Sequence, residues 1–396
     1  MYKTLEVLGP EHEFSLVDDE LKAKPIVDQA IRALAGRVMN NVSLDGFSFG
    51  KELQTHVAEV KANEPFASSK KFEETMYGAV TRIGGFLKKE FDVSLLGTGM
   101  HPFLTLDETG VWRHRDRRIY DALGRIFNMR QHGWLNIQSF QLNLPYRNEA
   151  EGVKLHNAIV NLLPYLPAIA ASSPIYESKV GRLTDNRLYF YGTSQREIPS
   201  VTGDVIPEYV SSFEEYQRRI ISAYTEDLKK AGAPSLLLNK EWINSRGAIF
   251  RFDRRAIEIR IMDEQECVKM DVALSCFIRA LLRGWMQRGL DYQSRDILID
   301  DYRSIVKDGL AAKVKNPAGR SARDVCLNFL NLARDYATEE ERDYLGLIEK
   351  RITQGNLAGL ILKDVVQSAA EKNFHNSVRE VYLNLIKCLR DNRPYP

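Results

Sequence analysis

The sequence predicts an α+β protein with a helical C-terminal region, and two patterns along the chain carry this prediction. Up to about residue 267, short runs of alternating polar and apolar residues are mixed with amphipathic helical segments. From Val268 onward, apolar residues recur at helical spacing almost throughout. We therefore expect a core of residues 1–290 and a helical region of residues 291–396 packed on it, with the boundary near residues 289–294.

Composition excludes several classes of protein. The chain has 396 residues, with 44% apolar and 27% charged residues, which is ordinary for a globular protein with a sizeable core. A net charge of +2 is too balanced for a protein dedicated to binding phosphate backbones. No apolar run approaches the ~20 residues that span a bilayer, and the first residues lack the pattern of an export signal. We expect a cytoplasmic protein with no nucleic-acid or membrane partner, and a homo-oligomer is left open.

Two helices are predicted before the C-terminal region. The first covers residues 72–87, with Ser68 or Ser69 as its N-cap, and the second covers about residues 150–171 and ends before a Ser-Ser-Pro turn. Residues 172–212 are rich in Gly, Pro, Ser, Thr and Asp and predict a long irregular loop, which in a compact domain is usually functional. Among the C-terminal helices, a polar break is expected near residues 316–319.

Four predicted strands carry polar side chains on one face. Residues two apart in a strand share a face, so each set below lies opposite apolar neighbours. The sets are Glu11 with Glu13, Glu59 with Thr55 and Val57 in a strand at residues 53–61, Ser139 with Gln141 and Asn143, and Glu258 with Arg260. Any one of these strands alone is typical of a sheet with one solvated face.

The residue types on these faces favour a metal site over a merely wet surface. Carboxylate and amide oxygens are the ligands that Mg²⁺ prefers, and converging carboxylates repel one another unless a cation lies between them. Glu52 fits less well, because its spacing of seven from Glu59 points the two side chains to opposite faces of an unbroken strand. Glu52 therefore precedes the strand, or a bulge intervenes, or Glu52 is outside the site.

Five segments, in this order, resemble those of the type 2 glutamate–cysteine ligase family, which are carboxylate–amine ligases and include the plant-type enzymes. GPEHEF (residues 9–14) is similar to the first metal-binding strand, and GKELQTHVAE (50–59) to the second acidic strand. SFQLNLP (139–145), followed by a helix ending in ASSP (171–174), is similar to the central strand and helix. DNR (185–187) occupies the place of a serine–X–arginine loop motif, and AIEIR (256–260) that of the last catalytic strand. The resemblance spans residues 5–290.

This resemblance implies a glutamine-synthetase-like fold, in which a curved, mainly antiparallel sheet is backed by helices and holds the site on its concave face. It implies an ATP- and Mg²⁺-dependent enzyme that joins glutamate to an amine such as cysteine through an acyl phosphate. Gln141 stands where many members have histidine and plant-type members have glutamine, so it would offer an oxygen beside the cofactor. The implied metal ligands are Glu11, Glu13, Glu52, Glu59 and Glu258, and the implied phosphate-binding groups are Arg187 and Arg260.

Other functions are compatible with the sequence. The chain could act on another acid or amine, or it could be a catalytically silent regulatory or binding homologue. A Walker loop is absent, so the nucleotide site must be of another kind. The basic run at residues 112–118 is interpreted as a solvated helix start rather than a phosphate-binding patch. The four cysteines are far apart in sequence and without a CxxC pair, which fits a reducing cytoplasm, and Cys267 and Cys276 are expected in the core.

Overall fold

One antiparallel sheet forms the centre of the molecule. The computed structural model describes residues 2–396. Seven strands follow one another across the sheet and an eighth, β5, pairs with β1 alone; every strand pair is antiparallel. In spatial order the seven are β2 (Asn41–Ser43), β3 (Phe47–Lys51), β4 (Val57–Ala62), β1 (Gly9–Val17), β6 (Ser139–Pro145), β10 (Ala256–Asp263) and β9 (Ala248–Arg251), with β5 at Ser94–Leu96. The predicted α+β class with an antiparallel sheet is confirmed.

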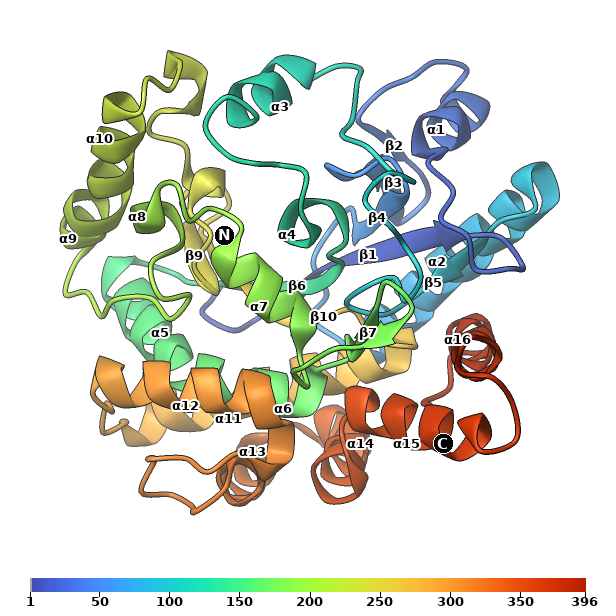
Figure 1. Cartoon of the computed structure of the whole chain (residues 1–396). Coiled ribbons are helices and arrows are strands. Elements are labelled where there is room, and N and C mark those ends of the chain that lie inside the picture. Colours follow the sequence, from blue (N-terminus) through green and yellow to red (C-terminus); the bar gives the residue numbers. More distant parts are fainter. Residues whose placement is uncertain (1) are drawn as a thin grey trace.

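Helices lie on both sides of this sheet (Figure 1). Against its apolar face lie α2 (Ser69–Phe91), α5 (Glu149–Leu162), α6 (Leu166–Ala170) and α11 (Val268–Arg288). Shorter helices lie on the other side or around the edges of the sheet: α1 (Val27–Ala35), α3 (Arg117–Leu123), α4 (His132–Leu135), α7 (Asn186–Thr193), α8 (Pro199–Thr202), α9 (Phe213–Tyr216) and α10 (Ala223–Lys230). The C-terminal region is helical, as predicted, with α12 (Arg295–Asp308), α13 (Ala322–Tyr336), α14 (Glu339–Gln354), α15 (Leu357–Ala369) and α16 (Phe374–Asp391).

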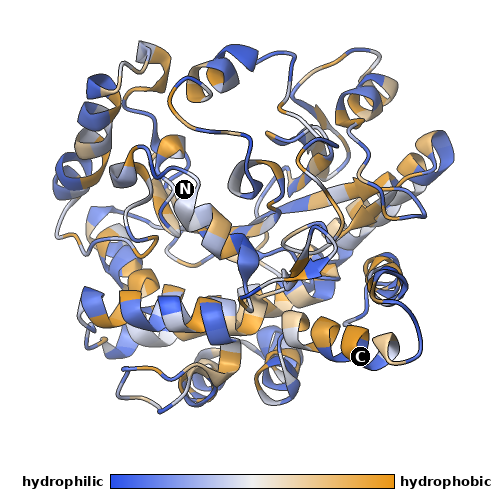
Figure 2. Cartoon of the chain, viewed as in Figure 1, coloured by the Kyte–Doolittle hydropathy of each residue, from blue (hydrophilic) through white to orange (hydrophobic). Residues whose placement is uncertain are grey.

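The alternation of polar and apolar residues along each strand determines which face of the sheet is buried against the helices. Phe14, Phe140 and Ile257 are fully buried on the face covered by α2, α5, α6 and α11. Their neighbours along each strand point to the other face. The outer helices show orange and blue residues side by side in Figure 2, as amphipathic helices do. The apolar face therefore anchors the strands, and the opposite face is free to carry polar side chains.

Several local predictions hold. Ser68 caps α2 by accepting a hydrogen bond from the Lys71 backbone, and α3 begins at Arg117 within the basic run. The helix expected at residues 150–171 is present, although the segment Leu163–Tyr165 between α5 and α6 forms one turn of 3₁₀ helix. The four cysteines are buried and free.

Two predictions are wrong. Residues 172–212 are not an irregular loop, because they form the hairpin β7 (Ile175–Tyr176) and β8 (Lys179–Val180) followed by α7 and α8. Arg187 therefore lies in the first turn of α7, behind the N-cap Asp185. The strand expected at residues 53–61 begins only at Val57, because residues 52–56 form the turn between β3 and β4.

A buried ion cluster fixes the C-terminal helices to α11. Glu341, fully buried in α14, pairs with Arg279 at 2.5 Å and with Arg283 at 2.9 Å. Removing one partner of a buried ion pair typically costs about 3–5 kcal/mol, because the other charge is left uncompensated. We expect Glu341→Gln to lower the free energy of unfolding by about 3 kcal/mol or more in urea titrations. The exposed Glu339→Gln, in the same helical turn, is the control and should change it by less than about 0.5 kcal/mol.

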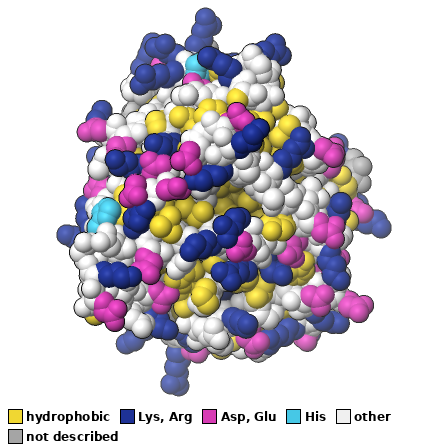
Figure 3. Space-filling model, turned by 90° about the vertical axis from the view of Figure 1, so that its right-hand side faces the viewer, with side chains coloured by type: hydrophobic (Ala, Val, Ile, Leu, Met, Phe, Trp, Pro, Cys, Tyr) yellow, Lys and Arg dark blue, Asp and Glu magenta, His cyan; other side chains and the backbone are white. Residues whose placement is uncertain are grey.

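The surface agrees with the balanced composition. On the side shown in Figure 3, Lys and Arg side chains are interspersed with Asp and Glu, and hydrophobic surface is exposed between them. Within residues 2–396, none of the helices has the length and apolar character needed to cross a membrane.

Candidate active site

The polar face of the sheet brings the predicted glutamates together. Strand β1 lies between β4 and β6, with Glu11 opposite both Lys61 and Gln141. Glu13 lies opposite Glu59 on β4. On β10, Glu258 lies opposite Asn143 of β6. Four carboxylates from three strands therefore share one face, which was the prediction from their period-two spacing.

Glu52 joins this face by a different route. It directly follows β3, where Gly50 pairs with Glu59 of β4, so Glu52 begins the turn of the hairpin and Glu59 lies in its second strand. Of the three alternatives left open, the structure selects the one in which Glu52 precedes the strand. The carboxyl group of Glu52 lines the same pocket as Glu13 and Gln141.

The two arginines reach the site from β10 and α7. Arg260 contacts Glu258, with Nε 2.9 Å from Oε1. The Arg187 side chain is 1% exposed, its Nε donates to Asp263, and both it and Arg260 line the pocket that holds Glu13. The predicted residues Glu13, Glu52, Gln141, Arg187 and Arg260 thus border one pocket, whose volume is about 270 Å³.

Asp263 is a site residue that the sequence pattern missed. Its spacing of five from Glu258 would place the two side chains on opposite faces of a regular strand. A register shift between Ile259 and Met262 changes the alternation, so that Asp263 lies opposite Ser139 and reaches Arg187. No pattern of residue types marks this bulge in the sequence.

Basic side chains already contact most of the carboxylates. Lys61 lies 2.5 Å from Glu59, and Arg254 lies 2.6 Å from Glu11. Arg251 pairs with Glu258 from the neighbouring strand β9. These three cations were not predicted, although Lys61 is two residues from Glu59 and shares its face by the same period-two rule.

Glu13 is held by neutral donors instead. Its Oε2 accepts a hydrogen bond from the Ser139 backbone at 2.7 Å, and its Oε1 accepts one from Gln141 Nε2 at 2.8 Å. Gln141 therefore turns its amide nitrogen to Glu13, which leaves its oxygen available as an acceptor or ligand.

Electrostatics divide the carboxylates into two kinds. Burial opposes ionisation of Glu11, yet Lys61 and Arg254 together lower its pKa to about 2. Burial and the nearby Glu59 raise the pKa of Glu13 to about 7, and burial with Glu13 as a neighbour raises the pKa of Glu52 to about 7. Burial, Glu11 and Glu52 raise the pKa of Glu59 well above its usual value. Three of the five carboxyl groups thus lack enough positive charge around them, which a divalent cation would supply.

The donor set suits Mg²⁺. Carboxylate and amide oxygens predominate, and no cysteine belongs to the set. Mg²⁺ commonly binds through one or two protein carboxylates, with water and substrate phosphates completing its shell, so glutamates spread along a face can hold it. Among residues 2–396, the one group of three metal-ligating side chains with ligand atoms within 4.8 Å is His12, Glu264 and Asp271, on the opposite face of the sheet.

Open space lies at both ends of the carboxylate row. The pocket of about 270 Å³ contains Trp134, Tyr191 and Trp242 in addition to the charged residues. A second pocket of about 360 Å³ reaches Glu11, Lys61 and Arg254. The row therefore separates two spaces, each lined by at least one glutamate and one basic side chain.

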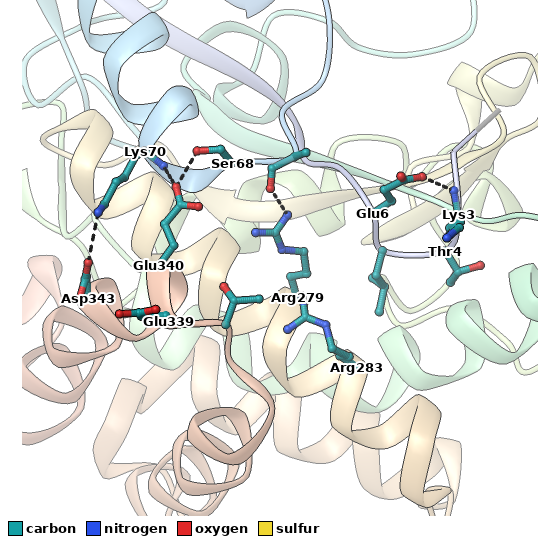
Figure 4. A pocket seen from close by; sticks show the side chains of 13 residues that line it. Lys3, Thr4, Glu6, Ser68, Lys70, Arg279, Arg283, Glu339, Glu340 and Asp343 are labelled. Atoms are coloured by element: carbon teal, nitrogen blue, oxygen red, sulfur yellow. Dashed lines mark hydrogen bonds and ion pairs between the residues drawn. The ribbon is translucent and has the colours of Figure 1, made fainter.

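A larger cavity of about 940 Å³ lies elsewhere, between the N-terminal segment and helices α2, α11 and α14. In Figure 4, Glu340 lies between Ser68 and the Lys70 backbone, and Lys70 lies beside Asp343. None of the predicted site residues lines it. Because Glu13, Glu52 and Glu59 of the carboxylate row have raised pKa values that a bound cation would relieve, the row is the better candidate for an active site.

Comparison with known proteins supports the class that the fold and site define. A glutamate–cysteine ligase from Francisella tularensis, solved in complex with AMP, has a TM-score of 0.69 at 14% identity, covering 98% of this chain and 90% of that chain. A bifunctional glutathione synthetase from Pasteurella multocida has a TM-score of 0.62 at 14% identity, covering 97% of this chain and 53% of that chain. The fold is that of ligases of this kind.

The family is shown by sequence. The model of glutamate–cysteine ligase family 2 (GCS2) matches residues 7–383, and the chain belongs to this family. It is therefore a carboxylate–amine ligase in class, as the resemblance of the five segments predicted. An uncharacterized protein from Archaeoglobus fulgidus is 43% identical over 389 residues, covering 98% of this chain and 100% of the relative.

Proposed function

We propose that the protein is an ATP- and Mg²⁺-dependent ligase that forms a γ-glutamyl amide through an acyl phosphate, with cysteine as the amine. The observation that carries this proposal is the row of five glutamates on one face of the sheet. Glu13 and Glu52 of this row line one pocket together with Arg187 and Arg260, and Glu11 lines a second pocket. Transfer of a phosphoryl group between two substrates depends on carboxylates that hold metal ions and on cationic side chains that stabilise the negative charge, and both kinds of residue lie here. A cytoplasmic location is part of the proposal.

The chemistry explains why these residue types are needed. A carboxylate oxygen is a poor leaving group, so the γ-phosphoryl group of ATP is transferred to it and ADP departs. The amine nitrogen then attacks the acyl carbon, phosphate leaves, and the amine loses a proton. The phosphoryl group in transfer carries dense negative charge, which fixed cations stabilise strongly in a site shielded from water.

Each group of residues has a part in this reaction. Glu11, Glu13, Glu52, Glu59 and Glu258 would hold Mg²⁺, with the Gln141 side chain as a further oxygen ligand. Mg²⁺ would neutralise the charge on the phosphate oxygens. Arg187 and Arg260 would contact the transferred phosphoryl group from the wall of the pocket. Asp263 orients Arg187, and Glu258 orients Arg260.

Product analysis tests the proposal. We expect ADP release when ATP and Mg²⁺ are incubated with glutamate and cysteine, and loss of this release with excess EDTA. Because the carboxylate oxygen bonds to phosphorus in the acyl phosphate and leaves with the phosphate when the amine attacks, ¹⁸O from labelled glutamate should appear in inorganic phosphate. A parallel panel of other carboxylates and amines identifies the pair with the highest rate. AMP as the nucleotide product, with the label in AMP, would contradict an acyl phosphate.

A further inference from the structure

The glutamate Glu13 lies at a junction where β1 changes partner. On one edge of β1, strand β6 pairs with Gly9 to His12, and β5 pairs with Ser15 to Val17. Glu13 and Phe14 lie opposite neither strand, so the sheet does not supply a backbone acceptor for Glu13 on this edge. A buried N–H group without a partner costs about 1–3 kcal/mol, so some other acceptor is required.

Glu264 supplies that acceptor from the opposite side of the sheet. Its Oε2 accepts a hydrogen bond from the Glu13 backbone N–H at 3.1 Å. Its Oε1 lies 3.1 Å from Nδ1 of His12, the residue next to Glu13. The Glu264 side chain thus fills the gap between β5 and β6 and holds two consecutive residues of β1.

Glu264 is itself firmly fixed. It is fully buried directly after β10, its backbone N–H donates to Gln138, and its carbonyl oxygen accepts from Ser172 Oγ at 2.8 Å. A carboxylate held in this way can set the position of the β1 backbone, because neither its chain nor its side chain is free to move.

We propose that Glu264 is a positioning residue that aims the Glu13 carboxylate at the metal through the Glu13 backbone. This inference rests on the proposed function, since it takes Glu13 as a metal ligand. Glu13 thus has contacts on both sides of β1. Its backbone N–H donates to Glu264, and its carboxylate accepts hydrogen bonds from Ser139 and Gln141 on the site face. Groups behind metal ligands commonly change metal affinity by about 10–100-fold.

Two substitutions distinguish the length of the Glu264 side chain from its charge. Glu264→Asp keeps the charge but is one methylene too short to reach the Glu13 N–H, whereas Glu264→Gln loses the charge but keeps an acceptor oxygen at the same distance. We expect Glu264→Asp to weaken Mn²⁺ binding about tenfold or more, and Glu264→Gln to stay within about threefold of the wild type. Mn²⁺ alone serves as the probe, titrated into the full chain and followed by the paramagnetic resonance of the free ion.

Asp271→Asn provides the matched control. Asp271 is equally buried and lies 3.5 Å from the same His12 nitrogen, but it has no hydrogen bond to Glu13. It should leave Mn²⁺ affinity within about threefold of the wild type even if the melting temperature falls. Equal losses in Asp271→Asn and Glu264→Asp would overturn the proposal, because the buried cluster would then act through the fold or bind the ion itself.

Glu258→Gln separates this proposal from the function on which it rests. If Glu258→Gln weakens Mn²⁺ binding and Glu264→Asp does not, the metal face stands and the positioning role is overturned. Weakening by Glu264→Gln as large as that by Glu264→Asp also overturns it. If the wild type does not bind Mn²⁺ specifically, or if Glu258→Gln leaves that binding unchanged, the assigned metal face is wrong. The positioning role of Glu264 then falls with it.

Discussion

Glu258→Gln is expected to lower the rate of ligation at saturating Mg²⁺ by about 10²-fold or more while the protein stays folded. The substitution keeps the side-chain volume but removes the charge of a carboxylate that is 1% exposed on β10. It also takes the ion-pair partner from Arg260, so one change affects both the proposed metal face and the arginine proposed to bind phosphate. Turnover is measured by ADP formation, and folding by circular dichroism and thermal melting.

Glu208→Gln is the matched control for this experiment. Glu208 also pairs with an arginine, Arg246, through two hydrogen bonds of 2.7 and 2.9 Å, but it is outside the carboxylate row. Glu208→Gln should lower the melting temperature and leave the rate of ADP formation nearly unchanged. Near wild-type ligation by Glu258→Gln would mean that the site has been placed on the wrong residues.

The strands and their polar faces were predictable because a strand has a fixed period. Once β1, β6 and β10 are recognised, the side-chain alternation assigns Glu11, Glu13, Gln141 and Glu258 to one face without knowledge of the pairing. The apolar residues between them must be buried, which fixes which face meets the helices. Long amphipathic helices such as α2 were predictable for the same reason, since their period is also fixed.

Where the strand period is interrupted, side-chain positions could not be predicted from residue spacing. The β3–β4 turn breaks the spacing between Glu52 and Glu59, and the bulge in β10 moves Asp263 to the site face. Glu264 carries no signal at all, because its partners at Glu13 and His12 are about 250 residues away in the chain. Side chains that act at interruptions or over long separations depend on tertiary pairing, which residue spacing does not encode.

The predicted loop at residues 172–212 led to a wrong expectation for the stability effect of replacing Arg187. An arginine in an irregular loop would be replaceable with little effect on stability. In the structure Arg187 is buried in the first turn of α7, pairs with Asp263, and directs both terminal nitrogens to the Arg260 carbonyl oxygen at 3.5 Å. It is therefore both a structural and a pocket-lining residue, and the two roles need separate measurements.

Arg187→Lys is expected to lower both the stability of the protein and its turnover. A lysine keeps the charge but not the planar fork that bonds Asp263 while facing a phosphate, so some buried acceptors lose their donor, at a cost of about 1–3 kcal/mol in the free energy of unfolding. Turnover at saturating substrates, measured well below the melting temperature, should fall about 10²-fold if Arg187 contacts the transferred phosphoryl group as proposed, because that group then loses a fixed donor.

Arg351→Lys distinguishes the two contributions. Arg351 is an equally buried arginine paired with a buried carboxylate, Glu266, and it lies outside the pocket of Glu13. Its replacement should cost a similar free energy of unfolding and leave the rate of ADP formation unchanged. If Arg187→Lys and Arg351→Lys prove alike in both stability and turnover, Arg187 serves the fold alone. If only Arg187→Lys slows ADP formation, its guanidinium acts on the phosphoryl group, since the loss of a buried ion pair alone does not produce that difference.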